Sequence, residues 1–351
     1  MTALLPLFLL IVGFVALVLG ANWLVNGATS IGVKAKLSPL IIGLTIVAFG
    51  TSLPEMIVNV FSCIKGSPGL AIGNIIGSNT MNILLILGVS SMIFPIDVSK
   101  ITIKRDIPTG FVATLAITLM ANDFFQSTSG TINWWEGLVL LLMGVVYLFL
   151  TLQKNSEHSE NLEYLENFDD SENQETQQEL PWGKTIFQLV LGIIGLYIGG
   201  ELVSNNAQKL ALSWGMSEST VGLTVVATAT SLPELITSIV AALKKNSAIA
   251  IGNVLGSNIM NIFMVLGVSA LITPLPFDAK MNQQLLILFV ANTIMLTTVF
   301  TGKGRMISRF EGFILTLGYV GFILSFFVCF GELLVNFGFV SVWITCKLSV
   351  F

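Results

Sequence analysis

A thirteen-residue sequence that occurs twice is the feature that most constrains how this chain folds. The first copy, GLTIVAFGTSLPE, spans residues 43–55, and the second, GLTVVATATSLPE, spans residues 222–234, with ten of the thirteen positions identical. Each copy places a single carboxylate, Glu55 or Glu234, beside hydroxyls and a proline in the middle of an apolar run. A lone carboxylate inside a membrane helix is costly, so it is a functional residue by default. Two such carboxylates at matching positions strengthen that hypothesis.

A second block follows each copy at the same distance along the chain. Residues 71–82 read AIGNIIGSNTMN, and residues 250–261 read AIGNVLGSNIMN. Small residues let helices approach one another closely inside a membrane. We therefore interpret the four glycines that these blocks share as packing residues: Gly73, Gly77, Gly252 and Gly256.

The composition indicates an integral membrane protein. Of the 351 residues 54% are apolar and only 10% are charged, whereas a soluble domain carries about 25% charged residues. Nine of the twenty acids lie in one central loop, residues 155–179, which we interpret as a solvated linker. The only histidine, His158, lies in this loop, which argues against the usual zinc sites and against Ser–His or Cys–His catalysis. The sequence has no basic stripe that would suggest a nucleic-acid partner.

Ten apolar runs are long enough to cross roughly 30 Å of hydrocarbon. They lie near residues 4–26, 39–62, 70–94, 107–122, 134–152, 184–207, 219–243, 248–272, 284–300 and 309–330. We expect an all-α membrane protein of ten transmembrane helices, with four parts along the chain. These are two five-helix repeats at residues 1–152 and 184–330, an acidic linker at 153–183, and an apolar tail at 331–351 that either extends the tenth span or adds another.

The loop cations predict the orientation. If the N-terminus defines one side, the loops on the opposite side hold twelve lysines and arginines, and the N-terminal side holds four. Because positive residues gather in cytoplasmic loops, we expect the N-terminus outside, the acidic loop in the cytoplasm and the protein in the cell (inner) membrane. Five crossings separate the two copies, so a direct repeat in sequence becomes an inverted repeat in the membrane. Transporters with this architecture bind substrate near the midplane, between the repeats.

The repeated motif supplies oxygen ligands beside its carboxylate. Proline at positions 54 and 233 removes a backbone donor and clashes with the preceding turn, so we expect freed carbonyls just before each glutamate. Carbonyl, hydroxyl and carboxylate oxygens suit hard cations such as Ca²⁺ and Na⁺. On a helix, residues four apart share a face. Each threonine of the motif therefore shares a face with its glutamate, as Thr51 does with Glu55 and Thr230 with Glu234.

The second block adds short polar side chains at the same one-turn spacing, Ser78 with Asn82 and Ser257 with Asn261. We expect the four polar helix faces to converge on one cavity. One Ca²⁺, or sodium ions entering together, would neutralise the two glutamates, whereas an empty site would carry two uncompensated carboxylates through a low-dielectric state. The loaded protein therefore reorients and the empty one resists, as obligatory antiport requires.

Three further acids lie in or beside the spans. Glu136 and Glu311 each begin a span, and the helix macrodipole explains a carboxylate there. Glu201 falls in the sixth span, at the position that matches Asn22, and we interpret it as a wetted or hydrogen-bonded residue.

The paired GTSLPE and ATSLPE sequences, each followed by GNxxGSNxxN, look like the two alpha-repeats of the sodium/calcium exchanger family, within the calcium/cation antiporter superfamily. The resemblance covers nearly the whole ten-span body. It implies an inverted-repeat exchanger with its ion sites between the second, third, seventh and eighth helices. The first and sixth helices, with ANWLVNGA at residues 21–28 and GELVSNNA at residues 200–207, resemble the family's sliding gate pair.

The resemblance also implies roles for individual residues. Matched motif by motif, calcium would be held by the two glutamates together with the backbone carbonyls of the two threonines: Glu55, Glu234, Thr51 and Thr230. Flanking sodium sites would use side chains and one carbonyl on each side: Thr51, Ser78 and the carbonyl of Ala48, then Thr230, Ser257 and the carbonyl of Ala227. Asn82 and Asn261 complete the candidate set.

Two departures from the family pattern alter these expectations. Many relatives have aspartate where this chain has Asn261, so the site loses a titratable group and the case for potassium dependence weakens. The second copy has Ala229 where the family usually has glycine, which predicts that the seventh helix unwinds less than the second.

The central loop is too short for the folded calcium-sensing domains of animal exchangers, so we expect no such regulation.

The sequence favours a secondary antiporter that moves Ca²⁺ outward against Na⁺ influx, with no resident cofactor. An antiporter of the same fold that uses H⁺ stays open, because Glu55 and Glu234 could themselves protonate. An intramembrane enzyme would need a nucleophile with a base or a catalytic metal, and no histidine lies near the repeats. A channel is a further alternative, but paired acids that must be occluded suit alternating access better than conduction.

Overall fold

The computed structural model describes residues 4–66, 68–122, 130–157, 181–213, 227–279, 281–301 and 305–330. In this part of the chain, seven helices are long and apolar enough to cross a membrane. They coincide with seven of the ten predicted spans, those that begin near residues 4, 39, 70, 134, 184, 248 and 284. The chain is therefore a mostly helical integral membrane protein.

The other three predicted spans take different forms. Helix α6 (Ile107–Ala121) has only 15 residues and follows the π-helical turn η3 (Thr102–Asp106). The described part of the seventh predicted span forms α11 (Ala227–Thr230) and α12 (Leu232–Leu243), while residues 219–226 lie outside the described residues. Helix α16 (Arg309–Phe330) covers the tenth predicted span.

Most of the predicted linker, and all of the predicted tail, lie outside the described residues. At the ends of the linker, helix α7 (Trp134–Glu157) runs on to Glu157 and α9 (Trp182–Ser213) begins at Trp182. The two helices therefore extend into the range 153–183 from both sides.

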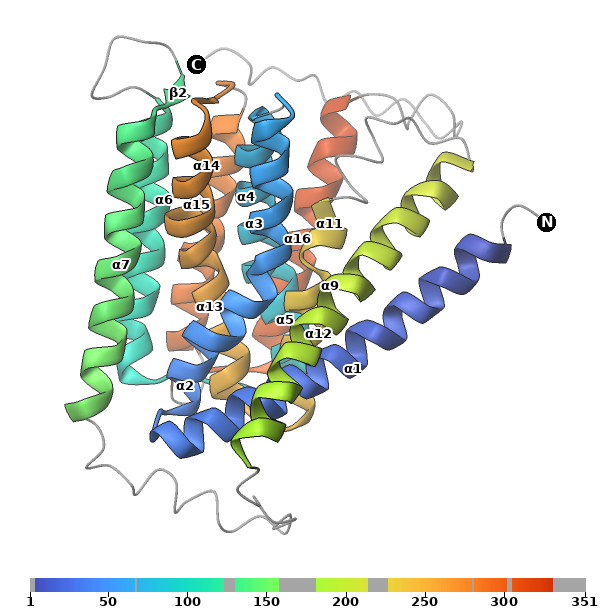
Figure 1. The fold of residues 1–351 in the computed structure, drawn as a ribbon. Helices are drawn as coiled ribbons and strands as arrows, with labels where there is room; N and C mark the ends of the chain where they lie inside the picture. The colour runs from blue at the N-terminus through green and yellow to red at the C-terminus, as the bar shows by residue number, and fades with distance from the viewer. Residues whose placement is uncertain are drawn as a thin grey trace.

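Helices α1 (Leu4–Ala35) and α9 run obliquely across one side of an upright bundle, packed against each other (Figure 1). Glycines allow their backbones to touch. A Cβ on Gly20 would lie 2.7 Å from the backbone nitrogen of Leu196, and a Cβ on Gly192 would lie 2.6 Å from that of Leu24. Any larger side chain at these two positions would push the helices apart.

Helix α13 (Ser247–Met260) is the centre of the bundle, and nearly all of its residues are buried. It packs against one continuous helical segment made of α2 (Pro39–Ile42), η1 (Gly43–Val47) and α3 (Ala48–Ile64).

The glycines of the second block bring these two segments together. A Cβ on Gly252 would lie 2.8 Å from the carbonyl oxygen of Leu40, and one on Gly256 would lie 2.7 Å from that of Leu44, which confirms both as packing residues. Among the described residues no such close contact meets Gly73 or Gly77.

The two halves of the chain build similar segments around this centre. In the first half, α4 (Gly69–Met81), η2 (Asn82–Ile86) and α5 (Leu87–Ile93) follow one another. In the second half, α13 continues into η5 (Asn261–Leu266) and α14 (Gly267–Ile272). The π-helical turn begins at Asn82 in one half and at Asn261 in the other, which are corresponding positions of the repeated block.

Short strands and outer helices connect the halves at the two ends of the bundle. Strand β1 (Ile96–Asp97) pairs with β4 (Met306–Ile307), and β2 (Thr131–Ile132) pairs with β3 (Leu275–Pro276), both antiparallel. Helix α7 packs on α14, α16 packs on α5, and α15 (Met281–Thr301) packs on α6.

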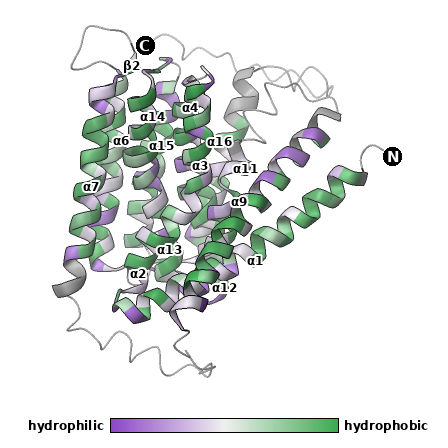
Figure 2. Ribbon diagram, in the orientation of Figure 1, coloured by the Kyte–Doolittle hydropathy of each residue, from purple (hydrophilic) through white to green (hydrophobic). Residues whose placement is uncertain are grey.

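The outside of the bundle is apolar and the inside holds polar residues (Figure 2). Large apolar side chains are exposed on α1, α7, α9 and α16, for example Phe8, Phe149, Phe187 and Phe313. A soluble protein rarely exposes so much contiguous apolar surface, so this surface faces lipid.

The structure places Glu136 and Glu311 at helix starts, as predicted. The backbone nitrogen of Asn133 donates to Oε2 of Glu136 at 2.7 Å, where α7 begins, and that of Ser308 donates to Oε2 of Glu311 at 2.6 Å, where α16 begins. A glutamate that binds a backbone N–H three residues earlier is the return half of a capping box. These two carboxylates stabilise helix ends.

Candidate functional site

The structure brings the two repeated glutamates together. Glu55 on α3 and Glu234 on α12 are both fully buried and interact electrostatically. A hydrogen bond joins the two copies of the motif, in which the hydroxyl of Ser52 donates to Oε1 of Glu234 at 3.2 Å. Two buried carboxylates side by side repel each other and have lost their hydration, which is costly without a compensating charge.

Several buried oxygens in this region lack a hydrogen-bond donor. Among the described residues, no donor in good geometry reaches either oxygen of Glu55, Oε2 of Glu234, or Oδ1 of Asn82 and Asn261. Buried acceptors without partners are rare in folded proteins and call for an unseen partner such as a water or an ion. A set of oxygens that only accept fits a cation.

The donor set also limits the kind of cation. No group of three or more His, Cys, Asp or Glu side chains that could hold a metal occurs in the described ranges. A cation here would have two carboxylates and would take its other ligands from hydroxyl, amide and carbonyl oxygens. Such all-oxygen sites suit hard cations such as Ca²⁺ and Na⁺.

The two threonines of the candidate set bind asparagines of the opposite half. The hydroxyl of Thr51 donates to Oδ1 of Asn253 at 3.1 Å, and the hydroxyl of Thr230 donates to Oδ1 of Asn74 at 3.2 Å. Asn253 also donates to Ser238 and to the backbone oxygen of Glu234, at 2.9 and 3.3 Å.

Sequence analysis did not single out Asn74 and Asn253. They are separated by the same offset as Thr51 and Thr230, and they occupy the same place in the repeated second block. Asn74 donates to Oδ1 of Asn59, which stands where Ser238 stands in the other half. Their shared offset in the sequence could have indicated these two asparagines. Only the fold shows which residues they bind in the opposite half.

Asn82 and Asn261 belong to a second network between α4 and α13. The amide of Asn82 donates to Oδ1 of Asn258 at 2.9 Å, and the amide of Asn261 donates to Oδ1 of Asn79 at 3.2 Å. Asn79 and Asn258 in turn each donate to the other's backbone oxygen, at 3.0 and 3.2 Å. These bonds use the amide nitrogens and leave Oδ1 of Asn82 and Asn261 as acceptors.

The remaining candidates lie at the edges of the same region. The hydroxyl of Ser257 lies 3.4 Å from that of Thr51, and the amide of Asn261 donates to Ser78 at 3.3 Å. The carbonyl of Ala48 accepts a bond of 3.2 Å from Thr51, so it faces this threonine. Ala227 begins α11, the short helix that also carries Thr230.

The prediction that the seventh helix unwinds less than the second is wrong. The helical segment with Pro54 is continuous from Pro39 to Ile64, with a π-helical turn at its start. The other helix breaks at Ser231, between α11 and α12, two residues before Pro233. In the first copy Thr51 is fully buried, whereas Thr228 and Thr230, next to the break in the second copy, are only half-buried.

Buried, unpaired oxygens on two proline-containing helices within a membrane bundle are the arrangement expected of an ion transporter. The sodium/calcium exchanger protein family model matches residues 5–153 and 184–328. The chain therefore belongs to the sodium/calcium exchanger family. Members of this family are transporters, and the chain is a membrane antiporter rather than an enzyme.

Individual relatives agree with this assignment. The chain is 37% identical to the putative antiporter CaxA of Alkalimonas amylolytica, with 89% of this chain and 95% of the relative covered. It is 31% identical to the sodium/calcium exchanger MaX1 of Methanosarcina acetivorans, with 91% and 97% covered. A structure of the sodium-calcium exchanger NCX_Mj superposes with a TM-score of 0.75 at 30% identity, with 92% of this chain and 99% of the other covered.

Proposed function

We propose that this protein exchanges Ca²⁺ for Na⁺ across the membrane by alternating access, at a site built around Glu55 and Glu234. The observation that carries the proposal is the pair of fully buried carboxylates with oxygens that no donor reaches among the described residues. A cation is the partner that this pair lacks. The relative MaX1, which is named a sodium/calcium exchanger, supports the choice of ions.

Charge balance makes the exchange obligatory. One Ca²⁺ neutralises both carboxylates, and so do sodium ions that enter together. An empty site would take two uncompensated charges through an occluded, low-dielectric state, which costs far more than carrying a neutralised one. Only the loaded protein therefore reorients at a useful rate.

The proposed ligands are those that the resemblance to the sodium/calcium exchanger family implies for the repeated motifs. Calcium lies between the two glutamates, with the backbone carbonyls of Thr51 and Thr230. Sodium ions flank it on two sides, one near Ser78 and the carbonyl of Ala48, the other near Ser257 and the carbonyl of Ala227. The free amide oxygens of Asn82 and Asn261 complete the ring of acceptors.

The architecture that suits this function is ten helices in two inverted five-helix repeats. Three observations support it: π-helical turns at corresponding asparagines, strand pairs that each join the two halves, and threonine–asparagine bonds that cross between the halves in both directions. We place the N-terminus outside and the acidic loop inside the cell. The relative YrbG of Escherichia coli, 35% identical over 89% of this chain and 94% of its own length, is named an inner membrane protein, which supports the cell membrane as the location.

The test is uptake of ⁴⁵Ca²⁺ into sodium-loaded proteoliposomes, with wild type beside Glu55→Gln and Glu234→Gln. We expect uptake driven by the outward Na⁺ gradient in the wild type, and a loss of at least about a hundredfold in either variant, because a neutral amide cannot replace a buried charged ligand (about 3 kcal/mol or more). Asp97→Asn is the matched control, since Asp97 is an exposed carboxylate at the end of the bundle, in β1.

Uptake of ⁴⁵Ca²⁺ into the same vesicles under a Na⁺ gradient or a pH gradient identifies the counter-ion. Uptake that follows an imposed pH gradient and ignores Na⁺ would contradict the sodium assignment and establish Ca²⁺/H⁺ exchange. Full activity in either glutamine variant would refute the two-glutamate site.

A further inference from the structure

Glu201 is a carboxylate that the proposed transport site does not use, and it lies within a membrane-spanning helix. It sits on α9, inside the candidate span Trp182–Ala207. Its side chain is exposed, unlike those of Glu55 and Glu234. Placing a charged side chain against lipid near the centre of a bilayer costs several kcal/mol, at least about 3. An exposed carboxylate at this depth therefore belongs on a face that water reaches.

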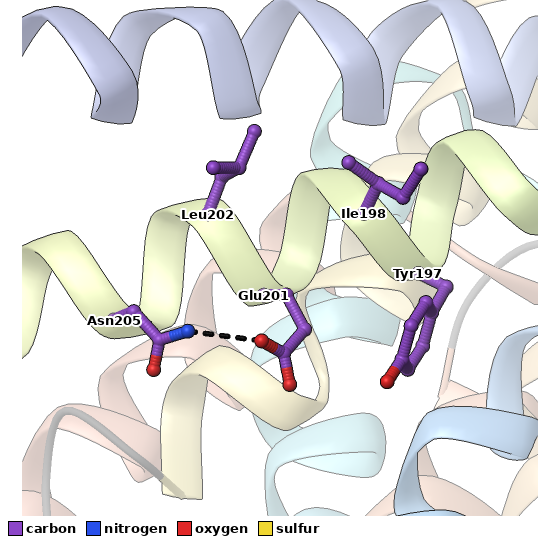
Figure 3. Close-up of a pocket in the computed structure, with 5 residues that line it drawn as sticks. All are labelled: Tyr197, Ile198, Glu201, Leu202 and Asn205. Carbon is purple, nitrogen blue, oxygen red and sulfur yellow. Dashed lines mark hydrogen bonds between the residues drawn. The ribbon is translucent and has the colours of Figure 1, made fainter.

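A shallow, open cavity of about 290 Å³ lies along α9, and all five of its lining residues belong to this one helix: Tyr197, Ile198, Glu201, Leu202 and Asn205 (Figure 3). Three polar residues one turn apart, Tyr197, Glu201 and Asn205, point to the same side, away from α1. The amide of Asn205 donates to Oε2 of Glu201 at 2.9 Å, which orients the carboxylate. The other carboxylate oxygen and the amide oxygen of Asn205 point the same way in Figure 3.

This cavity lies beside the helix that carries the transport site. Helix α9 packs against both α11 and α12. A Cβ on Gly200 would lie 3.8 Å from the proline ring of Pro233, so the residue before Glu201 lies beside the residue before Glu234. Glu201 therefore lies at a similar height in the bundle to Glu234, but its side chain is exposed.

We propose that the cavity around Glu201 and Asn205 is an outer cation site, where a hydrated Ca²⁺ or Na⁺ is held before it reaches Glu55 and Glu234. This rests on the proposed function for the identity of the ions and for the site at Glu55 and Glu234 to which they pass. The oxygens on this face are too few to strip a cation of its water, since Ca²⁺ takes six to eight oxygen ligands, so the ion keeps most of its hydration shell. One carboxylate in a recess raises the local concentration of cations and speeds their capture.

The first test separates capture from transport. Rates of ⁴⁵Ca²⁺ uptake are measured against Ca²⁺ concentration at low and high ionic strength, with choline chloride as the added salt. Glu201→Gln should raise KM about threefold to tenfold at low ionic strength and leave kcat unchanged. The effect should fade as salt screens the charge. Glu201→Asp should recover most of the affinity, and the control Asp97→Asn should leave KM unchanged.

The second test measures binding without transport. In a chain whose three cysteines are replaced by serine, Tyr197→Cys places a thiol on the same side of α9 as Glu201, and the rate of its modification by the cationic reagent MTSET is measured with and without Ca²⁺. Glu234→Gln is included to disable the transport site. Millimolar Ca²⁺ should slow the modification at least about twofold, and adding Glu201→Gln should abolish that protection.

The two tests fail in distinguishable ways. Protection of the thiol by Ca²⁺ in a protein that shows no sodium-driven uptake would sink the proposed function and keep the outer site. Equal modification rates with and without Ca²⁺, or a Glu201→Gln variant whose KM matches the wild type at low salt, would overturn the outer site alone.

Discussion

Helix α3 and the pair α11–α12 carry nearly the same sequence motif, yet their backbones differ. In the first copy the helix passes through Pro54 without a break. In the second copy it stops at Ser231, and α12 begins again just before Pro233. The comparison teaches that the motif supplies the same polar side chains twice, whereas the tertiary surroundings decide how the backbone presents them.

The side-chain contacts of the two copies are similar but not equal. Both threonines bind an asparagine of the opposite half. Of the two carboxylates, Glu234 accepts a bond from Ser52, whereas no donor in good geometry reaches Glu55 among the described residues. We infer that the halves share one site and contribute to it unequally. The following predictions test that inequality.

We expect the largest effect from a substitution where α13 packs closely on the first copy of the motif. Gly256→Val would place a side chain 2.7 Å from Cβ of Ala48 and from the backbone oxygen of Leu44, and backbone cannot move aside. We expect a loss of about 3 kcal/mol in the free energy of unfolding, at the upper end for overpacking, and a fall of several degrees in Tm. Thermal unfolding of the purified protein in detergent measures this.

The control is Gly321→Val on α16, where a Cβ meets nothing within 4 Å among the described residues. An unchanged Tm in Gly256→Val would show that α13 does not hold the first helix in its continuous form.

The next largest effect is expected for the two asparagines that bind a threonine of the opposite half, Asn253 and Asn74. Asn253 is fully buried and makes three side-chain hydrogen bonds that reach both carboxylate-bearing helices, whereas Asn74 is half-buried and makes two. Asn253→Ala should cost about 2 kcal/mol and Asn74→Ala about half of that, because each unpaired buried group adds its own desolvation cost. Thermal unfolding and ⁴⁵Ca²⁺ uptake measure the pair. Equal losses would mean that the two halves are equivalent here.

A smaller effect is expected at the serines of the motif. Ser52 donates to the carboxylate of Glu234 and lies inside α3, whereas Ser231 lies at the helix break and makes no capping bond to α12. Ser52→Ala should weaken Ca²⁺ transport about fivefold, equivalent to about 1 kcal/mol, since hydrogen bonds inside membranes are of that size. Ser231→Ala should have less effect. KM for ⁴⁵Ca²⁺ uptake tests both, and a larger loss at Ser231 would reverse the inequality.

The smallest effect concerns the lysines that follow the two helices, Lys65 after α3 and Lys244 after α12. The ammonium of Lys244 donates to Asn26 of α1 at 2.7 Å, and partial burial there lowers the pKa of Lys244. Between that lowered pKa and the ordinary value of about 10.4, the unfolded chain binds more protons than the folded one, so stability rises with pH.

Thermal unfolding between pH 8 and pH 10 tests this pH dependence. Lys244→Gln should remove a small part of the rise in Tm, and Lys65→Gln, at the corresponding position, is the matched control. A fall in Tm over this range that disappears in Lys244→Gln would contradict the expected sign.

Much of the candidate site could be proposed from the sequence because its residues are unusual in a membrane span. Glu55 and Glu234 stand out in apolar runs, and the constant offset between the two copies links them to their threonines, serines and asparagines. The apolar runs predicted seven of the spans directly. Both signals, hydropathy and motif spacing, can be read along the chain without knowing how it folds. The composition alone identified a membrane protein.

Only the tertiary structure decided which residues meet across the halves. The bond from Thr51 to Asn253 joins residues 202 positions apart, and no local pattern specifies it. The helix break at Ser231 also reversed the expectation drawn from Ala229, because the tertiary surroundings of a helix outweigh the local preference of one residue. The exposure of Glu201 likewise depends on how α9 crosses its neighbours. The sequence by itself determined the class, the charges and their repetition, and long-range packing determined their contacts.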